Sequence, residues 1–440
     1  MFAYARLILA PVIDPFLSGD FLPLVLRFIP LVLFFELPLL VFIILGVVKY
    51  RLQLSFEGER RPFFPSVSVI ITCYSEGGEI QDTIRTVAEQ LYPGRIQILA
   101  MIDGASVNKN TYEAALEMEG YVAGLKNRAF MTVPKWQRGG RVSSINTGLN
   151  FADGEIVMVV DGDTSFDNNM VERATRHFED PSVVAVAGCL RVKNADENLV
   201  TMLQAIEYFI SIQSAKTGLS SYNMVNNISG AFGIFRRGVV DLVRGWDAGT
   251  AEDLDITMRI KNYFGRSKFR IVFDPQAMGY TSVPETLRAF FRQRLRWDGD
   301  LSYIYFRKHS RSFSPRLIGW PNFFMMLLNG LFTQIALPAV IFIYTLWLFF
   351  FYPLHYAVGL ALLIYLFYFM LYATVYFIFV ACVSERREED LSRAIYLPLL
   401  PLFTFATRIN AVFALIWELG SRAHLDSSMA PWWVARKNKF

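Results

Sequence analysis

Four long runs of apolar residues interrupt a chain that elsewhere mixes apolar and polar positions. Runs at residues 22–48, 323–353 and 355–383 are almost wholly apolar, and a fourth run at 395–417 is interrupted by polar residues. A helix needs roughly 20 apolar residues to cross the hydrocarbon core of a bilayer, so the first three runs are long enough. The pattern predicts a globular domain at 55–315 that is framed by membrane segments.

The fourth run differs from the others because it contains residues that a lipid-exposed helix tolerates poorly. These are Pro398, Pro401, Arg408 and Asn410. We therefore expect an interfacial or re-entrant segment in which Arg408 faces protein or a polar conduit. The stretch before residue 22 is short, which predicts an interfacial helix or a short first span.

Between residues 55 and 315, short runs rich in β-branched residues predict strands that are buried on both faces. Strands that alternate with helices predict an α/β domain with a parallel or mostly parallel sheet, in which ligands bind at the carboxyl ends of the strands. The predicted strands cover residues 66–72, 95–102, 156–160 and 183–187, and a helical pattern covers 80–90. Three of these strands end in polar residues, which predicts one nucleotide site. The first strand ends at Thr72 and is followed by Tyr74 and Glu76, the second is followed by Asp103, and the third by Asp161 and Asp163.

Composition and charge place this domain at a membrane. The chain of 440 residues is 53% hydrophobic with a mean hydropathy of +0.33, which is unusually apolar for a soluble protein. The net charge is only +4, but basic residues gather beside the spans and at the C-terminus: Lys49, Arg51, Arg60, Arg61, Arg386, Arg387, Arg436, Lys437 and Lys439. By the positive-inside rule these regions and the domain are cytoplasmic, although such clusters also serve solubility alone. The scattered cysteines and histidines predict neither a disulfide framework nor a Cys/His metal site.

Asp161-Gly162-Asp163 follows directly after a predicted strand of apolar residues. Two carboxylates at this spacing, with glycine between them, can both reach a cation held in the loop. Mg²⁺ and Mn²⁺ prefer oxygen ligands and also bind substrate phosphates, so the triplet predicts a metal that neutralises a diphosphate leaving group. The alternative is a solvated turn, in which Asp and Gly are also common.

Ala251-Glu252-Asp253-Leu254-Asp255 opens a second helical pattern, which continues over residues 256–263. Acidic residues near a helix N-terminus are stabilised by the helix dipole, and this alone explains the segment. The functional alternative is a general base that removes a proton from a sugar hydroxyl, and we assign that role to Asp253. Asp255 lies two positions further on and would point elsewhere on a helix.

The segment Gln293-Arg294-Leu295-Arg296-Trp297 lies on a helix predicted to start near Pro284. Gln293, Arg296 and Trp297 occupy positions i, i+3 and i+4 and so share one face. A guanidinium suits a diphosphate, and an indole suits the apolar face of a sugar ring. The alternative is an amphipathic helix at the membrane surface, where we expect Arg292 and Arg294 to reach towards the headgroups.

Taken together, these motifs resemble the membrane-embedded, processive family-2 glycosyltransferases. That family includes the cellulose, chitin, hyaluronan and poly-N-acetylglucosamine synthases, and the layout of this chain is most similar to the last of these. The resemblance runs from about Val67 to Trp297 and continues into the C-terminal spans. It implies a GT-A fold, with a Rossmann-like, mostly parallel sheet in a cytoplasmic domain that transmembrane helices frame.

The resemblance also implies roles for individual positions. It makes Asp253 the catalytic base and Asp163, with Asp161, the ligand of Mg²⁺ or Mn²⁺. Acceptor binding falls to Trp297 and to the loop residues Ser229, Gly230 and Phe232. The implied nucleotide contacts are Thr72, Tyr74, Glu76, Asp103, Arg141, Asp161, Gln293, Arg296 and Arg436. The residues Trp433, Arg436 and Lys437 are similar to a gating segment that closes over the nucleotide, although a basic tail could instead hold the chain at an anionic membrane surface.

The chain departs from the family pattern at three positions. Ala251 stands where the family has Thr before Glu-Asp, Arg141 replaces the usual Lys, and Asp103 is the only acid at the end of the second strand. Residues 198–222 are apolar at helical spacing, and they resemble an interface helix beneath the catalytic domain, although a core helix fits the pattern equally well.

We therefore expect a membrane segment at 1–50, a cytoplasmic GT-A domain at 51–317, two transmembrane helices at 318–383 and an interfacial and gating region at 384–440. The expected activity is processive, inverting transfer from a nucleotide-sugar, with a UDP-sugar as the expected donor, and extrusion of the polymer across a bacterial inner membrane. The expected partners are the nucleotide-sugar donor, the growing polysaccharide and the lipid bilayer, with an accessory membrane or periplasmic subunit left open and no nucleic acid.

Two alternatives compete with this expectation. One is a transferase that loads a single sugar onto a lipid carrier, but single-transfer relatives usually lack the Gln-x-x-Arg-Trp pattern. The other is a scaffold subunit with a decayed site, which predicts the loss of an acid, whereas all four acids are present: Asp103, Asp161, Asp163 and Asp253.

Overall fold

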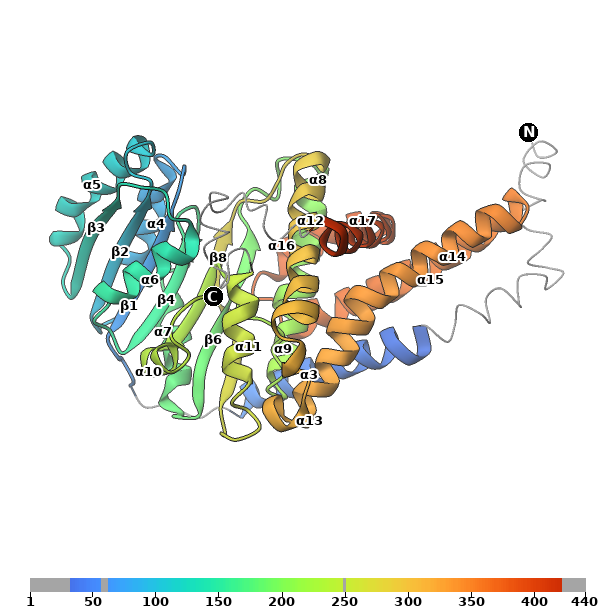
Figure 1. Ribbon diagram of the computed structural model, residues 1–440, viewed down its shortest axis with the longest axis horizontal. Helices are drawn as coiled ribbons and strands as arrows, with labels where there is room; N and C mark the ends of the chain where they lie inside the picture. Colours follow the sequence, from blue (N-terminus) through green and yellow to red (C-terminus); the bar gives the residue numbers. More distant parts are fainter. Residues whose placement is uncertain (1–31, 57–61, 248–250, 422–440) are drawn as a thin grey trace.

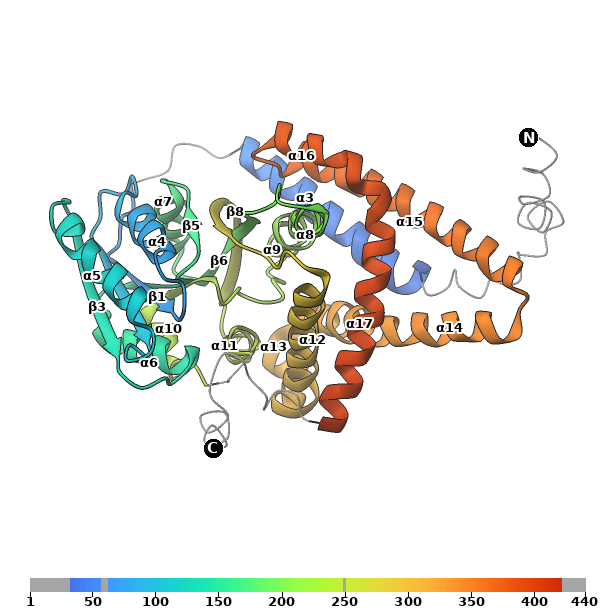
Figure 2. The same cartoon turned by 90° about the horizontal axis from the view of Figure 1, so that it is seen from above.

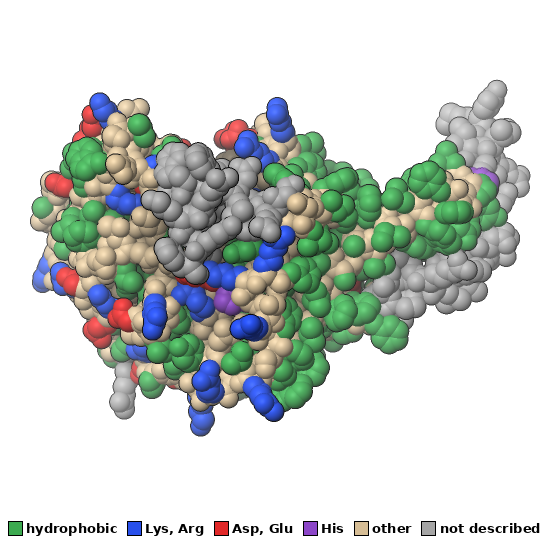
Figure 3. All heavy atoms as spheres, in the orientation of Figure 1, with side chains coloured by type: hydrophobic (Ala, Val, Ile, Leu, Met, Phe, Trp, Pro, Cys, Tyr) green, Lys and Arg blue, Asp and Glu red, His purple; other side chains and the backbone are tan. Residues whose placement is uncertain are grey.

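The computed structural model describes residues 32–56, 62–247 and 251–421. An α/β domain occupies one side of the molecule, and a group of long apolar helices projects from the other side (Figures 1 and 2). In the space-filling view the visible face of the projecting helices carries mainly hydrophobic side chains, whereas Lys and Arg gather over the globular part (Figure 3).

One mixed sheet organises the α/β domain. Within the described residues its strands follow the order β3-β2-β1-β4-β7-β6-β8-β5. The first four run parallel, as the sequence predicts, but β7 runs antiparallel to β4 and β6, so the sheet is mixed. The strands are β1 Val67–Cys73, β2 Ile96–Asp103, β3 Arg128–Lys135, β4 Ile156–Asp161, β5 Ser165–Phe166, β6 Val183–Val192, β7 Phe232–Arg236 and β8 Arg270–Thr281.

Helices cover both faces of this sheet, which explains why β1, β2 and β6 are buried along their whole length. The apolar faces of α4 (Glu79–Ala88), α5 (Lys109–Ala123) and α7 (Met170–Thr175) pack into one core cluster on one side. On the other side α6 (Arg141–Phe151), α10 (Arg237–Leu242) and α11 (Glu252–Lys261) pack into a second cluster. The result is a three-layer α/β/α arrangement.

The strand register brings the predicted polar strand ends to one edge of the sheet. Thr72 of β1 is paired with Met101 of β2 on one side and with Asp161 of β4 on the other. Because these strands are parallel, their carboxyl ends meet at the same edge, where loops can hold a ligand.

Four helical segments among the described residues are long and apolar enough to cross a membrane: Phe34–Ser55, Pro315–Phe351, Leu354–Cys382 and Arg387–Gly420. They contain α3 (Leu37–Ser55), α13 (Pro315–Met325), α14 (Leu337–Phe351), α15 (Leu354–Cys382), α16 (Arg387–Arg393) and α17 (Leu400–Ser421). The three apolar runs that the sequence predicts as spans overlap the first three segments, and residues 22–31 of the first run lie outside the described residues.

The helix α17 lies across the other apolar helices. In Figure 1 α17 is seen end-on, whereas α14 and α15 are seen from the side. In Figure 2, the view from above, α17 runs across them. Arg408 of this helix forms an ion pair with Glu36 and lies over the ring of Tyr368, so it faces protein as expected. The segment expected to be interfacial or re-entrant is thus also long enough to span a membrane, so its placement stays a prediction; α12 (Leu287–Tyr303) packs along α17.

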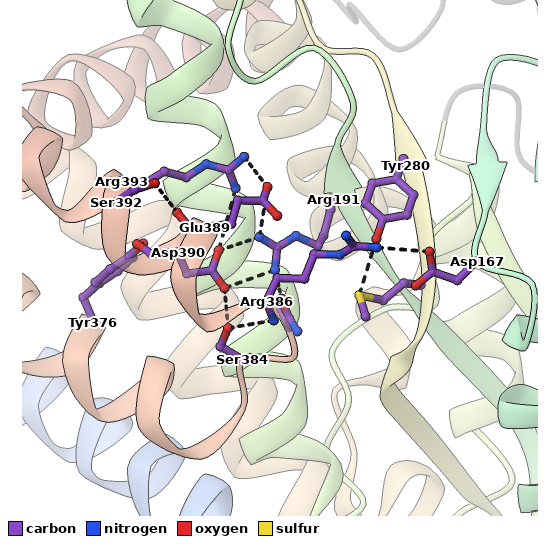
Figure 4. Close-up of polar contacts among 12 residues, drawn as sticks. Asp167, Arg191, Tyr280, Tyr376, Ser384, Arg386, Glu389, Asp390, Ser392 and Arg393 are labelled. Atoms are coloured by element: carbon purple, nitrogen blue, oxygen red, sulfur yellow. Dashed lines mark hydrogen bonds and ion pairs between the residues drawn. The ribbon is translucent and has the colours of Figure 1, made fainter.

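Two joints fix the apolar helices to the α/β domain. The first is a close crossing of α3 with α9 (Ala215–Ser220), where a Cβ on Gly46 would lie 2.2 Å from the Gly218 carbonyl oxygen. The second is a buried polar network between β6 and the loop around α16 (Figure 4). There Arg191 Nη1 donates to Asp390 Oδ2 at 3.2 Å, and Ser384 Oγ donates to the same carboxylate.

Candidate active site

The site begins at the edge where β1 and β4 end. Thr72 Oγ1 lies 3.2 Å from Asp161 Oδ1. Arg141, the first residue of α6, donates to Thr72 Oγ1 at 2.8 Å and forms an ion pair with Asp161. Three residues that the sequence places in separate segments therefore form one cluster.

Arg141 also reaches the elements on the far side of the site. Its Nε lies 2.7 Å from Glu252 Oε1, and its Nη2 donates to the Gly230 carbonyl at 2.6 Å. The side chain is only 8% exposed. A guanidinium with this many protein partners ties the end of β4 to the start of α11, so Arg141 organises the site in addition to the nucleotide contact expected of it.

Glu252 carries the most perturbed carboxyl of this cluster. Burial raises its pKa to about 8, with the charges of Asp253 and Asp161 adding to the effect and the Arg141 guanidinium opposing it. Glu252 therefore retains a proton at neutral pH, although its Oε1 lies next to the Arg141 guanidinium. It is not free to take a proton from a substrate.

The three acids at the start of α11 have three different environments. Asp255 is buried against Arg259, Lys308 and His309, at 2.7, 2.9 and 2.8 Å, so it is a structural residue, as the helix spacing predicts. Burial alone would raise its pKa, but the hydrogen bond from His309 and the two cations lower it to about 2. Asp253, by contrast, is only half-buried.

Two hydrogen bonds hold the Asp253 carboxylate in place, and no Lys or Arg among the described residues forms an ion pair with it. Its Oδ1 accepts the backbone N–H of Leu254 at 2.7 Å, and its Oδ2 accepts Asn227 Nδ2 at 3.3 Å. It lines a small cavity with Glu252, Ser229 and Gly230. Of the three acids, Asp253 is the one that a substrate hydroxyl can reach.

A second group of carboxylates surrounds Gly162. Burial, together with the charge of Asp161, raises the pKa of Asp163 to about 6. Burial also raises the pKa of Glu76 to about 7, against the backbone hydrogen bonds that lower it. A Cβ on Gly162 would lie 3.1 Å from Glu76 Cγ, so a larger residue would have to displace the Glu76 side chain slightly. Acids this close together favour a bound cation.

The donor set fits a divalent cation that completes its shell from a substrate. The Glu76 Oε2 atom is buried without a hydrogen-bond partner among the described residues. Those residues contain no cluster of three or more His, Cys, Asp or Glu side chains arranged as a complete metal site. Mg²⁺ and Mn²⁺ sites of this kind take one or two carboxylates and fill the remaining positions with water and phosphate oxygens.

Asp103 and Tyr74 lie at the base of the same edge. The Asp103 carboxylate accepts Lys135 Nζ at 2.8 Å and the backbone N–H groups of Gly139 and Gly140 at 2.8 and 2.9 Å. Gly140 has a positive φ of 81°, which favours glycine, and it directly precedes Arg141. Asp103 thus fixes the loop that aims Arg141. Tyr74 is exposed, and the Arg138 guanidinium lies 3.9 Å from its ring centroid.

The helix α12 presents Gln293, Arg296 and Trp297, all half-buried. It starts later than predicted, because Thr286 caps it by accepting the Ala289 N–H at 3.2 Å, and Pro284 lies before the cap. The Gln293 Oε1 atom is buried without a hydrogen-bond partner among the described residues. Such an atom is costly unless a ligand or water satisfies it.

The expectation that Arg294 reaches towards lipid headgroups is wrong. Its Nη2 forms an ion pair with Glu207 Oε2 at 2.7 Å, and its guanidinium lies 4.5 Å from the Trp297 ring centroid. Glu207 belongs to α8 (Leu199–Tyr208), so this pair anchors α12 to the segment beneath the site. Burial, with the charges of Glu207 and Asp163 adding and Arg294 opposing, raises the pKa of Tyr208 to about 12, which places this region near Asp163.

The loop residues expected at the acceptor site divide between two places. Ser229 and Gly230 line the cavity beside Asp253. Phe232 is the first residue of β7, and its fully buried ring packs edge-on against Phe166 in the core, so its side chain does not line the cavity. The predicted gating residues lie outside the described residues: Trp433, Arg436 and Lys437.

The motifs did not reveal several of the residues that shape this site. Asn227 contacts Asp253, and Lys216 lies behind it, with its Nζ donating to the Asn227 carbonyl at 3.1 Å. Glu207 and Lys216 are charges within the apolar segment 198–222. Their presence in an apolar segment is the sequence signal that could have identified them, because Lys and Glu are rarely buried without a partner.

Comparison with known proteins places this site in a family. A family model described as "Glycosyltransferase like family 2" matches residues 65–299, which is more than half of the chain. A poly-beta-1,6-N-acetyl-D-glucosamine synthase from Staphylococcus epidermidis is 30% identical over 233 residues, covering 52% of this chain and 53% of the relative. A protein of the same name from Staphylococcus aureus (strain MSSA476) is 27% identical over 281 residues, covering 62% of this chain and 65% of the relative. The matched parts thus span about half to two thirds of these relatives.

A solved structure shares the fold. The mannosyltransferase PcManGT from Pyrobaculum calidifontis, in complex with GDP-Man and Mn2+, is similar with a TM-score of 0.55 and 18% identity. The likeness covers 89% of this chain and 99% of that protein. It confirms the GT-A arrangement expected from the sequence.

Proposed function

We propose a function for this chain from the premise that it belongs to glycosyltransferase family 2, which makes it a glycosyltransferase. The function is polysaccharide synthesis: processive, inverting transfer of a sugar from a UDP-sugar to the end of a growing polymer. The names of the curated relatives support this reading and make UDP-N-acetylglucosamine the first donor to test.

The observation that carries the proposal is the position of Asp253. Glu252 beside it is buried and protonated, and Asp255 is bound by three cationic or hydrogen-bonding partners, whereas Asp253 faces the cavity. A carboxylate that is held by an amide and a helix N–H, but not neutralised, suits a general base.

The reaction balances around this carboxylate. The acceptor hydroxyl oxygen forms a bond to the anomeric carbon as its proton passes to Asp253. The bond between the anomeric carbon and the diphosphate oxygen breaks on the opposite side, which inverts the configuration. The nucleoside diphosphate leaves, and Asp253 returns its proton to water.

The remaining residues bind and orient the donor and acceptor. Arg296 and the side-chain N–H groups of Gln293 are proposed to contact the diphosphate, and Trp297 to stack the acceptor sugar. A divalent cation, Mg²⁺ or Mn²⁺, held by Asp163 with Asp161, would neutralise the charge that develops on the diphosphate. Asp163 is the better ligand, because Asp161 is already engaged by Arg141.

The membrane part supports an extrusion role. Apolar helices are fixed to the α/β domain by two joints, so a polymer made at this edge of the sheet starts next to the bilayer. We propose that the domain is cytoplasmic in a bacterial inner membrane and that 433–437 closes over the nucleotide. An accessory membrane or periplasmic subunit stays part of the proposal.

The proposal is tested with the full chain in detergent or nanodiscs. Release of nucleoside diphosphate is measured with Mn²⁺ or Mg²⁺ across UDP-glucose, UDP-N-acetylglucosamine, UDP-glucuronate and GDP-mannose, and products are sized. Long products from one UDP-sugar are expected. Release accompanied only by one-sugar products on a lipid would instead identify a single-transfer enzyme, and turnover of GDP-mannose alone would overturn the donor class.

A further inference from the structure

Lys216 is a charged residue in an otherwise apolar environment directly behind the site. It lies on α9 with a side chain that is 5% exposed. A buried lysine is unfavourable unless its ammonium has a partner that justifies the cost of removing it from water. The resemblance to known synthases assigns it no role, so its partners indicate what it does.

Those partners lead directly to Asp253. Lys216 Nζ donates to the backbone carbonyl of Asn227 at 3.1 Å. The side chain of the same residue donates from Nδ2 to Asp253 Oδ2 at 3.3 Å. Asn227 is therefore held at its backbone by the ammonium while its amide is aimed at the carboxylate.

The helix that carries Lys216 is itself fixed in place. Gly218 and Gly46 let α9 and α3 approach at backbone contact, and a Cβ on Gly218 would lie 2.4 Å from the Ile43 carbonyl oxygen. Ser221 Oγ donates to the Gly46 carbonyl at 2.8 Å, and Lys49 Nζ donates to the Ser221 carbonyl at 2.8 Å. Lys216 is thus held on a rigid support that includes the first apolar helix.

The charges around Lys216 and Asp253 can be named from each packed element. Asp253 is faced by Arg141 of α6, by its neighbour Glu252 and by Lys216 of α9. Burial lowers the pKa of Lys216 to about 8, with Asp253 and Cys189 of β6 opposing the shift. Lys216 and Arg141 are therefore the two cations that face Asp253, and Arg141 is in direct contact with Asp161 and Glu252.

We infer that Lys216 is a positioning residue for the proposed base: through Asn227 it aims the Asp253 carboxylate, and its ammonium favours the ionised carboxylate. This inference rests on the proposed function, because it takes Asp253 as the base. It adds a link from the first apolar helix, through α9, to the reacting group.

The test compares Lys216→Met and Lys216→Arg with the full-length wild type in nanodiscs. Lys261→Met is the matched control, because Lys261 is also a buried lysine, lies at the far end of α11, and has its pKa lowered by burial to about 7. For each protein kcat, KM for the donor, UDP affinity and the pH dependence of kcat are measured. UDP affinity also reports that each variant is folded.

For Lys216→Met we expect kcat to fall by about 10²-fold, as for a misaligned catalytic group, with KM and UDP affinity within about twofold of wild type. The alkaline limb near pH 8 should vanish with the lysine that titrates there. Lys216→Arg should recover part of kcat and extend activity to higher pH, and Lys261→Met should keep the wild-type profile.

The outcomes separate this inference from the proposed function. If Asp253→Asn is inactive but Lys216→Met keeps the wild-type kcat and pH profile, only the role of Lys216 is refuted. If Lys216→Met does not bind UDP, the pH dependence of kcat in Lys216→Arg is used instead. An alkaline limb at the wild-type pH refutes the inference, and a limb shifted to higher pH supports it. If Asp253→Asn keeps wild-type turnover, the proposed function itself fails.

Discussion

Arg141 Nε lies 2.7 Å from Glu252 Oε1, and both side chains are almost fully buried, at 8% and 6% exposure. The contact joins the first residue of α6 to the first residue of α11, and through Asp161 it also joins the end of β4. The end of β4, which leads to the proposed metal ligand, and the start of α11, which carries the proposed base, are therefore set relative to one another by one guanidinium on α6.

Replacing Arg141 should damage stability and activity together. Arg141→Ala removes the buried guanidinium beside the partly exposed Asp161 and its contacts with Thr72 and Gly230, which costs about 1–3 kcal/mol. Arg141→Lys should recover part of this loss but not activity, since a lysine cannot contact Thr72, Gly230 and Glu252 at once. Thermal unfolding in detergent and sugar transfer measure the two effects. An active, stable Arg141→Ala variant would show that the guanidinium does not organise the site.

Glu252 should make stability fall as pH rises. Its pKa is about 8 in the folded protein, against an ordinary value of 4.5 for this carboxyl, so the folded state binds the proton more tightly than the unfolded state does. The stabilisation from Glu252 is therefore complete below pH 4.5 and is lost as pH rises through 8. Glu252→Gln should flatten the dependence of the unfolding midpoint on pH across this interval. The exposed Glu119→Gln variant is the control, and an unchanged slope in Glu252→Gln would contradict the assignment.

Asp163 should be required for metal-dependent binding of the diphosphate. Asp163→Asn is expected to lower kcat/KM by at least about 10²-fold, because several kcal/mol of charge stabilisation are lost. The enhancement of UDP affinity by Mn²⁺, followed by titration calorimetry with and without EDTA, should disappear. Asp241→Asn is a matched control, since that carboxylate is 59% exposed on α10. Wild-type Mn²⁺ enhancement in Asp163→Asn would place the metal elsewhere.

Arg294 should affect the polymer rather than the donor. Arg294→Met removes a cation over the Trp297 ring, worth about 0.5–2 kcal/mol, and the pair with Glu207. We expect shorter products with an unchanged KM for the donor. Arg292→Met changes an exposed arginine on the same helix and should leave product length unaltered. Products of wild-type length from Arg294→Met would show that Trp297 is held by other contacts.

The joint between Arg191 and Asp390 should be a major source of stability (Figure 4). Arg191→Met removes the nearer of the two cations beside buried Asp390 and leaves only Arg393, with Nη1 3.7 Å from Oδ1, so it should cost up to about 3–5 kcal/mol. Arg270→Met breaks a surface pair whose side chains are 50% and 44% exposed, and it should cost less than about 1 kcal/mol. Thermal unfolding of the two variants tests this contrast. Equal effects would mean that the network does not hold the domain to the helices.

Strands and strand-end acids were predictable because they depend on local pattern. The runs of β-branched residues became β1, β2, β4 and β6, and the acids at their ends lie at one edge. The sequence pattern indicates the other strands only weakly, because β7 is short and because β3 and β8 contain prolines. β3 tolerates Pro134 because it is the edge strand, and β8 contains an irregular register at Pro275.

Partner choice across the fold was not predictable from spacing. Helical periodicity places Arg294 beside Gln293 and Trp297, but it does not show that Glu207 of α8 faces it. Likewise, the sequence singles out Arg141 and Asp103 as polar, but their partners are fixed only when β1, β2 and α11 meet. Phe232 was expected at the acceptor site because it follows the loop residues Ser229 and Gly230. It is instead the first residue of β7, where its side chain points into the core.

Asp253 is the residue on which the proposed chemistry depends, and Asp253→Asn is the most direct test of it. Nucleoside diphosphate release and UDP affinity are measured in parallel for wild type and variant, in nanodiscs with Mn²⁺ and the donor that the wild type uses. Loss of a general base predicts a fall in kcat of about 10²–10⁴-fold with UDP affinity unchanged. Turnover of Asp253→Asn at the wild-type rate would contradict the assignment of the base.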